Sequence, residues 1–175
     1  MKKSVTLILM LLAVCIFSSC RKNDNPKLPD GIEDGVLPKF TQTAGDEDLS
    51  NVATFTSTFK LESYFPNALK PSKVDIVVAI NGDYTNVKTI AAGITSLPVA
   101  STTVTGAQIL QLFGVTAADV EVLEIGADCT LPDGKVSKAF PYYIDSNGHM
   151  QTITPYAQNA YSLPGSNPEL YYQVP

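Results

Sequence analysis

Residues 73–83 read KVDIVVAINGD, and this stretch decides the expected fold class. Apolar side chains recur at every second position, and a period of two is typical of a strand with one buried face. The set expected to face inward is Val74, Ile76, Val78 and Ile80. Asn81-Gly82-Asp83 follows directly, and these residue types favour a tight turn. The stretch therefore predicts a buried strand that reverses direction at its end.

Further candidate strands lie on both sides of this one. In residues 55–61 the apolar Phe55, Phe59 and Leu61 alternate with polar residues, again with a period of two. Turn residues separate the other candidates, which are residues 87–94, 99–105, 120–130, 136–144, 149–154 and 170–174. Asp-Gly and Asn-Gly turns favour hairpins and thus antiparallel pairing. The sequence predicts an all-β fold, an antiparallel immunoglobulin-like β-sandwich of about seven strands with one short helix.

The short helix is expected to begin after Thr105. A threonine with Gln108 three residues later is a capping-box pattern, in which side chains satisfy free backbone N–H groups at a helix start. Gly114 suits the end of the helix. The apolar face between them consists of Ile109, Leu110, Leu112 and Phe113. Because only one helix is visible, a β/α fold is disfavoured.

The first residues have the pattern of a secretory signal peptide. Lys2 and Lys3 precede an apolar run over residues 5–17, which is shorter than the roughly 20 residues that an uncleaved membrane anchor would need. Phe17-Ser18-Ser19-Cys20 resembles a bacterial lipobox. The resemblance implies removal of residues 1–19 and acylation of Cys20, which would anchor the protein to a membrane. The alternative is an ordinary signal peptide with a chance cysteine.

Residues 20–48 predict a flexible acidic stalk. They contain several prolines, glycines and acids and no sustained apolar period. Such a segment buries too little apolar surface to offset the entropy of ordering it. The expected organisation is therefore a signal peptide over residues 1–19, a stalk over residues 20–48 and a β-sandwich domain over residues 49–175.

Composition limits the partners and the means of stabilisation. The formal net charge of −5 argues against nucleic acid as a partner, because nucleic-acid affinity comes mainly from Lys and Arg contacts with phosphate. Of the three cysteines, Cys15 would leave with the signal peptide and Cys20 would be acylated. Cys129 then has no intrachain partner and lies in an apolar strand pattern, which predicts a buried thiol. The domain must therefore be stable through its core.

Residues 74–136 contain the segments VDIVVAINGDYTNVKTI and VTGAQILQLFGVTAADVEVLEIGADCTLPDGKV. They resemble outer-membrane lipoproteins of Bacteroidota, in particular the immunoglobulin-like N-terminal domain of SusE-type starch-utilisation lipoproteins. The resemblance implies a protein anchored by lipid in the outer membrane and facing the cell surface. It also implies a part in nutrient uptake beside outer-membrane transporter proteins. In that family the residues that contact glycans lie mainly in later domains, so no binding residue is carried over.

Catalysis is not expected from these residues. His149 is the only histidine and follows a turn, and Cys129 is expected to be buried. The sequence has no zinc-ligand spacing, no Gly-rich phosphate loop and no GxSxG motif. The expectation is a protein that is not an enzyme and has no catalytic residues, no metal site and no cofactor.

Tyrosines are the candidate ligand-binding residues. Most of the eight tyrosines follow residue 140, and aromatic faces can stack on sugar rings. The candidates are Tyr142, Tyr143, Tyr171 and Tyr172. The alternative is that they pack the C-terminal segment onto the sandwich. The expected function is a non-catalytic accessory or binding module of a surface nutrient-uptake system, with a glycan as the ligand. The alternative function is a structural module for protein–protein assembly at the outer membrane.

Overall fold

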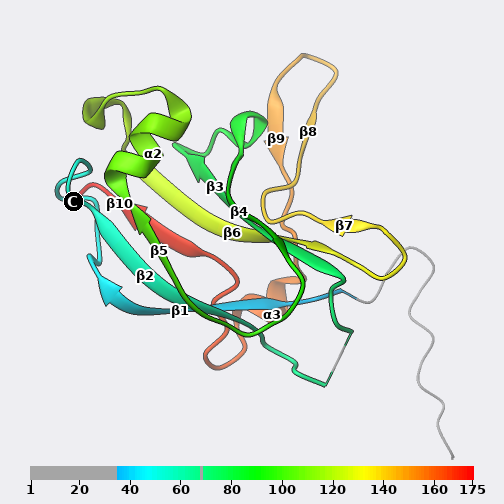
Figure 1. Cartoon of the computed structure of the whole chain (residues 1–175). Helices are drawn as coiled ribbons and strands as arrows, with labels where there is room; N and C mark the ends of the chain where they lie inside the picture. The colour runs from blue at the N-terminus through cyan, green and yellow to red at the C-terminus, as the bar shows by residue number, and fades with distance from the viewer. Residues whose placement is uncertain (1–34, 68) are drawn as a thin grey trace, which may run out of the picture. The chain divides into compact units, whose positions relative to one another are not determined.

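The protein was analysed as a computed structural model, which describes residues 35–67 and 69–175. These residues form two main antiparallel sheets and a separate hairpin (Figure 1). The first sheet has the order β1 (Pro38–Gly45), β2 (Thr56–Ser63) and β5 (Val99–Thr105). The second has the order β10 (Leu170–Gln173), β6 (Val122–Thr130), β3 (Lys73–Ile80) and β4 (Lys88–Ile94), with β7 (Val136–Ser137) also paired to β6. The hairpin consists of β8 (Tyr142–Ile144) and β9 (Met150–Thr152).

This strand order confirms the expected all-β, immunoglobulin-like sandwich. In such folds the first, second and fifth strands share one sheet, while the third, the sixth and the last strand share the other. The same division holds here: the first sheet contains β1, β2 and β5, and the second contains β3, β6 and β10. Strand β4 extends the second sheet. The short strands β7, β8 and β9 lie within the connection between β6 and β10, residues 131–169.

The core lies between the two sheets and follows the predicted alternation on β3. One buried cluster contains side chains from both sheets, among them Phe59 of β2 and Ile125 of β6. It also contains the four residues expected to face inward, Val74, Ile76, Val78 and Ile80. In β2 the same alternation buries Ser57, Phe59 and Leu61.

The other face of β3 is also covered, although by a smaller cluster. Val77 and Ala79 pack there against Ala139 and Phe140. Gly126 on β6 permits this approach, because a Cβ at that position would lie 3.1 Å from the ring of Phe140. This packing explains why the expected strand over residues 136–144 is wrong in part. The chain leaves β7 after Ser137, buries Phe140 on the sheet and enters β8 only at Tyr142.

Helix α2 (Gly106–Phe113) begins and ends as predicted. The Thr105 hydroxyl accepts a hydrogen bond from the backbone N–H of Gln108 at 3.2 Å, and Gly114 ends the helix with a φ of 69°. Ile109 is the side chain that the helix buries, while Leu110 and Phe113 are only partly buried against the same core. The remaining short helices are η1 (Tyr84–Asn86), η2 (Ala117–Asp119) and α3 (Gln158–Tyr161). Among the residues with described positions, no helix is long and apolar enough to cross a membrane.

The predicted stalk boundary is wrong for residues 35–48. Strand β1 pairs with β2 from Pro38 to Gly45, and Val36, Phe40 and Leu49 belong to the main core. The apolar residues of this segment are few and stand among prolines, glycines and acids, so their pattern is too short to predict a strand. Residues 20–34, with Cys20, and the expected signal peptide over residues 1–19 lie outside the described residues.

Cys129 is a free, buried cysteine, as its place in an apolar strand predicts. It points into the main core from β6. Burial raises the pKa of its thiol to about 12, with a smaller contribution from the charge of Asp128. A thiol in this state is a poor nucleophile, because the reactive form is the thiolate.

Candidate functional site

The four candidate tyrosines lie in three different environments. Tyr172 is 2% exposed and belongs to the core. Its ring packs edge-on against Phe55 with the centroids 4.9 Å apart, and its hydroxyl lies 2.7 Å from the Ser57 hydroxyl in a hydrogen bond. Tyr172 therefore packs the C-terminal segment onto the sandwich, as the alternative interpretation of the tyrosines expects, and its contact with a ligand stays a prediction. Along β10 the side chains alternate, so Leu170 and Tyr172 face inward and Tyr171 faces outward.

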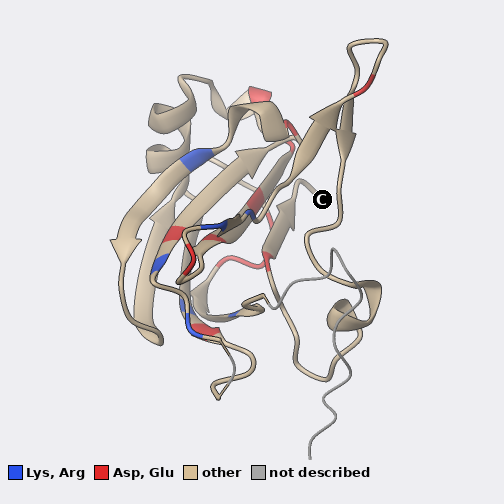
Figure 2. Cartoon of the chain, turned by 90° about the vertical axis from the view of Figure 1, so that its right-hand side faces the viewer, with Lys and Arg blue, Asp and Glu red and all other residues tan. Residues whose placement is uncertain are grey.

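Tyr142 and Tyr143 lie on β8, in the hairpin that projects beyond the two sheets (Figures 1 and 2). Both are exposed, as are Ile144 on the same strand and Ile153 after β9. Neither tyrosine is among the side chains that line the hollow beside β10 described below. The structure therefore does not bring the four candidate tyrosines together.

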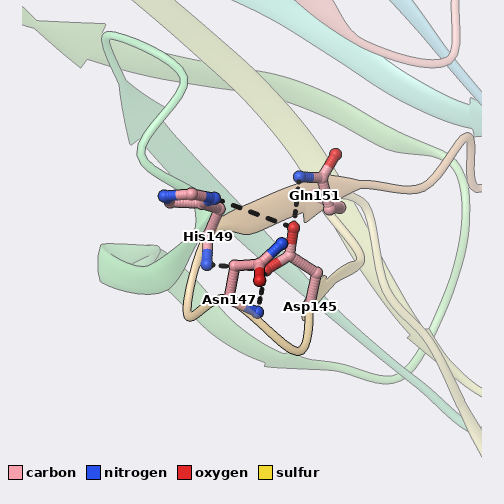
Figure 3. Close-up of polar contacts among 4 residues, drawn as sticks. All are labelled: Asp145, Asn147, His149 and Gln151. Atoms are coloured by element: carbon pink, nitrogen blue, oxygen red, sulfur yellow. Dashed lines mark hydrogen bonds and ion pairs between the residues drawn. The ribbon is translucent and has the colours of Figure 1, made fainter.

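The tip of this hairpin is held by Asp145 (Figure 3). One carboxylate oxygen, Oδ1, accepts hydrogen bonds from the backbone N–H groups of Asn147 at 2.8 Å and His149 at 2.9 Å. The other oxygen accepts one from the Gln151 amide at 3.1 Å and lies 3.8 Å from His149 Nδ1. The backbone bond from His149 contributes most to lowering the pKa of Asp145. His149 is thus an exposed part of a turn, and its side chain faces Asp145.

A hollow of about 430 Å³ lies beside β10, at the edge of the sandwich where β1 and β10 meet. Three of its lining residues are aromatic, Tyr161, Tyr171 and Tyr172, and four carry amide or carboxylate groups, Gln42, Glu47, Asn167 and Glu169. Of the two candidate tyrosines in this lining, Tyr171 is the exposed one, with 54% of its surface accessible, whereas Tyr172 is 2% exposed. We call this hollow the β10 groove.

Backbone hydrogen bonds between the two sheet edges hold the β10 groove in shape. The N–H of Phe40 in β1 donates to the carbonyl of Asn167 at 2.8 Å, and the N–H of Leu49 donates to the carbonyl of Gln173 at 2.9 Å. Gln42 is also fixed, because its Oε1 accepts a hydrogen bond from the Tyr172 hydroxyl at 3.0 Å and its amide nitrogen donates to a backbone carbonyl. The segment before β10, which supplies Asn167 to the groove, is therefore tied to β1 by a backbone hydrogen bond.

A second, smaller hollow of about 280 Å³ adjoins the first. The two share Tyr161 and Glu169, which therefore form a common wall. The second hollow is also lined by Tyr84 and Phe140, whose rings stack with centroids 5.1 Å apart. Together the two hollows place aromatic rings and a carboxylate side by side on the outer face of the second sheet.

A buried carboxyl group lies next to this wall. Glu124 of β6 is 7% exposed, and its Oε1 accepts a hydrogen bond from the Tyr84 hydroxyl at 2.8 Å. Its register partner across the β10–β6 pair is Tyr171, so both side chains project from the same face of the sheet. Burial raises the pKa of Glu124. Burial also raises the pKa of Glu169, and the nearby charge of Glu124 raises it further.

The lining chemistry is acidic and aromatic. No Lys or Arg of the described chain lines either hollow. Within residues 35–67 and 69–175 no group of three or more His, Cys, Asp or Glu is placed to hold a metal ion. The site can accept hydrogen bonds through its carboxylates and amides, and it can stack flat apolar faces on its tyrosines.

Sequence reasoning missed most of the β10 groove. Gln42 and Glu47 were assigned to the stalk, and Asn167 and Glu169 were interpreted as turn residues before the last strand. One signal was present for Glu169, because it precedes Leu170 and so shares the outward alternation of Tyr171. Nothing in the sequence pattern links Gln42 or Glu47 to residues more than one hundred positions later.

Comparisons with protein-family models, with curated proteins and with solved structures found no match to this chain. The interpretation of the β10 groove therefore rests on its own chemistry.

Proposed function

We propose that this protein is a non-catalytic, lipid-anchored binding module of a nutrient-uptake system at the outer membrane, and that it binds a glycan in the β10 groove. The observation that carries the proposal is the lining of this groove. Tyr161 and Tyr171 stand beside side-chain amides and carboxylates in a hollow of about 430 Å³. The resemblance of residues 74–136 to SusE-type lipoproteins supports the same setting.

Glycans suit such a lining for two physical reasons. The C–H face of a sugar ring is apolar and packs against the face of an aromatic side chain. Its hydroxyl groups are both donors and acceptors, and they pair with planar groups such as the Asn167 amide and the Glu169 carboxylate. The volume lies within the range of about 300–1,000 Å³ that is typical of small-ligand sites.

Replacing Tyr171 by alanine is expected to weaken glycan binding about tenfold, the loss that follows from removing one aromatic stacking partner. Tyr143→Ala is the matched control, because Tyr143 is 53% exposed, almost as much as Tyr171, and does not line the groove. Glycan-array screening of protein lacking residues 1–20 would find a ligand, and calorimetry would measure both variants. Equal affinity of the Tyr171→Ala and unsubstituted proteins would contradict the assignment of the groove.

The membrane anchor is tested separately at Cys20. We expect Cys20→Ala protein to lose labelling by a fatty-acid probe and to be released into soluble fractions or retained as precursor. The physical reason is that the Cys20 thiol is the proposed attachment point for the acyl chains, whose burial in lipid holds the domain at the membrane. Cys15→Ala is the control and should be labelled like the unsubstituted protein. Persistent labelling of Cys20→Ala protein would exclude lipidation at this residue.

The alternative function, a structural module for protein–protein assembly, is favoured by the β8–β9 hairpin. An isolated two-stranded hairpin is marginally stable in water, and clustered exposed apolar side chains often mark contact surfaces. Tyr142, Tyr143, Ile144 and Ile153 are exposed apolar or aromatic side chains on or directly after the strands of this hairpin. If the hairpin holds an outer-membrane transporter protein, Tyr143→Ala should reduce co-purification of that protein and leave glycan binding unchanged.

A further inference from the structure

The charges around the β10 groove all have the same sign. Glu47 and Glu169 line it, and the lining contributed by the described residues contains no Lys or Arg. A neutral sugar needs hydrogen-bonding groups but no charged ones. The excess of carboxylates over basic side chains therefore indicates that the charge of the ligand matters for binding. An anionic ligand, such as a uronic acid or a sulfated sugar, would meet carboxylates without a cation to pair with it, which is unfavourable.

Glu124 adds an independent observation. Its carboxylate is more than nine-tenths buried, and Oε2 has no hydrogen-bond partner in the part of the chain that the structure describes. Two groove residues lie near it: Tyr171 is its register partner on β10, and Glu169 is close enough for the charge of Glu124 to affect its pKa. A buried carboxylate without a counter-charge is costly, and a positive charge brought near it would offset part of that cost.

The aromatic residues favour the same kind of ligand. The face of an aromatic ring carries partial negative charge, so it attracts cations as well as apolar surfaces. Tyr161 and Tyr171 both line the β10 groove, and Tyr161 and Glu169 together form the wall that it shares with the second hollow. A ligand with an ammonium group next to a flat ring would satisfy the carboxylates and the aromatic faces at once.

We propose that the β10 groove recognises an amino sugar with a free, unacetylated amine, with its ammonium group beside Glu169 and its ring against Tyr161 and Tyr171. This inference rests on the proposed function, because it specifies the class of glycan that the groove binds. Recognition is then a charge-assisted hydrogen bond from the ammonium group to a carboxylate, together with ring stacking. Acetylation of the amine removes the charge and with it the larger part of the selectivity.

The test compares oligosaccharides that differ only in this group. Calorimetry would use the tetramer of glucosamine and the tetramer of N-acetylglucosamine, at about pH 6, where amines of this kind are largely protonated. We expect the unacetylated tetramer to bind at least about tenfold more tightly, since a charge-assisted bond in a partly buried site is worth that factor or more. The tetramer of galacturonic acid, which is anionic, should bind more weakly than either.

Glu169→Gln is the variant that isolates the charge. Glutamine keeps the size and the hydrogen-bonding oxygen of glutamate, so the acetylated tetramer should bind almost as before, while the preference for the unacetylated tetramer should disappear. Glu121→Gln changes the net charge of the protein by the same amount at an exposed position outside the groove, and it should retain the preference.

The possible failures are distinguishable. Equal binding of the acetylated and unacetylated tetramers would overturn this inference and leave glycan binding intact. Binding of tetralysine as tight as that of the glucosamine tetramer would overturn it too, because the groove would then recognise positive charge without the sugar ring. If neither these tetramers nor any glycan of an array binds, the proposed function itself fails. Loss of the preference in Glu169→Gln but not in Glu121→Gln protein is the supporting result.

Discussion

Replacing Phe40 by alanine is expected to destabilise the domain by about 3–5 kcal/mol, the usual cost of removing a large aromatic side chain from a packed core. Phe40 is 1% exposed, and its ring packs edge-on against Phe59 of β2 with the centroids 5.4 Å apart. Alanine would lose the transfer free energy of the ring and leave a cavity in the core between the two sheets. Urea unfolding of protein lacking residues 1–20 measures this loss directly.

The control is Thr41→Ala, on the exposed face of the same strand. Its cost should stay below about 1 kcal/mol, because only strand propensity and no core packing changes. If the two variants unfold at the same urea concentration, β1 does not belong to the folded domain and the expected boundary at residue 49 is restored. A shortened chain that begins at residue 49 should, for the same reason, be much less stable than one that begins at residue 35.

Gly106→Ala is expected to destabilise the domain by about 3 kcal/mol, the upper part of the range for inserting atoms into a packed site. A Cβ at this position would lie 2.8 Å from the carbonyl carbon of Val52 and closer still to its oxygen. The neighbouring atoms are backbone, so no side chain can rotate away. The N–H of Gly106 also donates to the carbonyl of Phe55 at 2.7 Å, and a shift that relieved the clash would lengthen this bond.

Whether Gly106→Ala stabilises or destabilises the protein shows which of two effects is larger, local helix propensity or tertiary packing. Gly106 is the first residue of α2, and within a helix alanine is more favourable than glycine by about 0.5–1 kcal/mol. Propensity alone therefore predicts that Gly106→Ala stabilises the protein. Gly35→Ala is the control, because a Cβ there has no atom within 4 Å. An unfolding midpoint for Gly106→Ala at or above that of the unsubstituted protein would show that the contact with Val52 is not maintained.

Much of the sandwich was predictable because its central strands are long and strictly patterned. Strand β3 has the bounds expected for it, and the buried residues of β2 follow a period of two, whereas β6 is buried on both faces from Leu123 to Ala127. The start and end of α2 were equally readable, since Thr105 and Gly114 act on backbone groups only a few residues away. These features depend on short-range chemistry, which the sequence contains in full.

Strand β1 and the interrupted segment after β7 were not predictable in this way. Phe40 stands among polar residues and becomes a core residue only because β2 pairs with it from another part of the chain. Phe140 was expected on a continuous strand, but it turns onto the outer face of the sheet. It does so because Gly126 leaves room there and the Asp128 carboxylate accepts a hydrogen bond from the Ala139 N–H at 2.8 Å.

In the candidate site, too, some features follow from the local sequence and others from tertiary contacts. The alternation along Leu170 to Gln173 predicts that Tyr171 and Tyr172 face opposite ways. It does not predict which of the two faces the core, because that depends on the partner strand. Pairing of β10 with β6 places Tyr172 in the core and Tyr171 outside, next to Glu124. The sequence by itself thus determined the fold class, the central strands and the local caps and turns, because these follow from residue type and spacing. Only the tertiary structure decided which tyrosine meets solvent, which glutamates are buried and which distant segments enclose the β10 groove, because these depend on contacts between residues far apart in the chain.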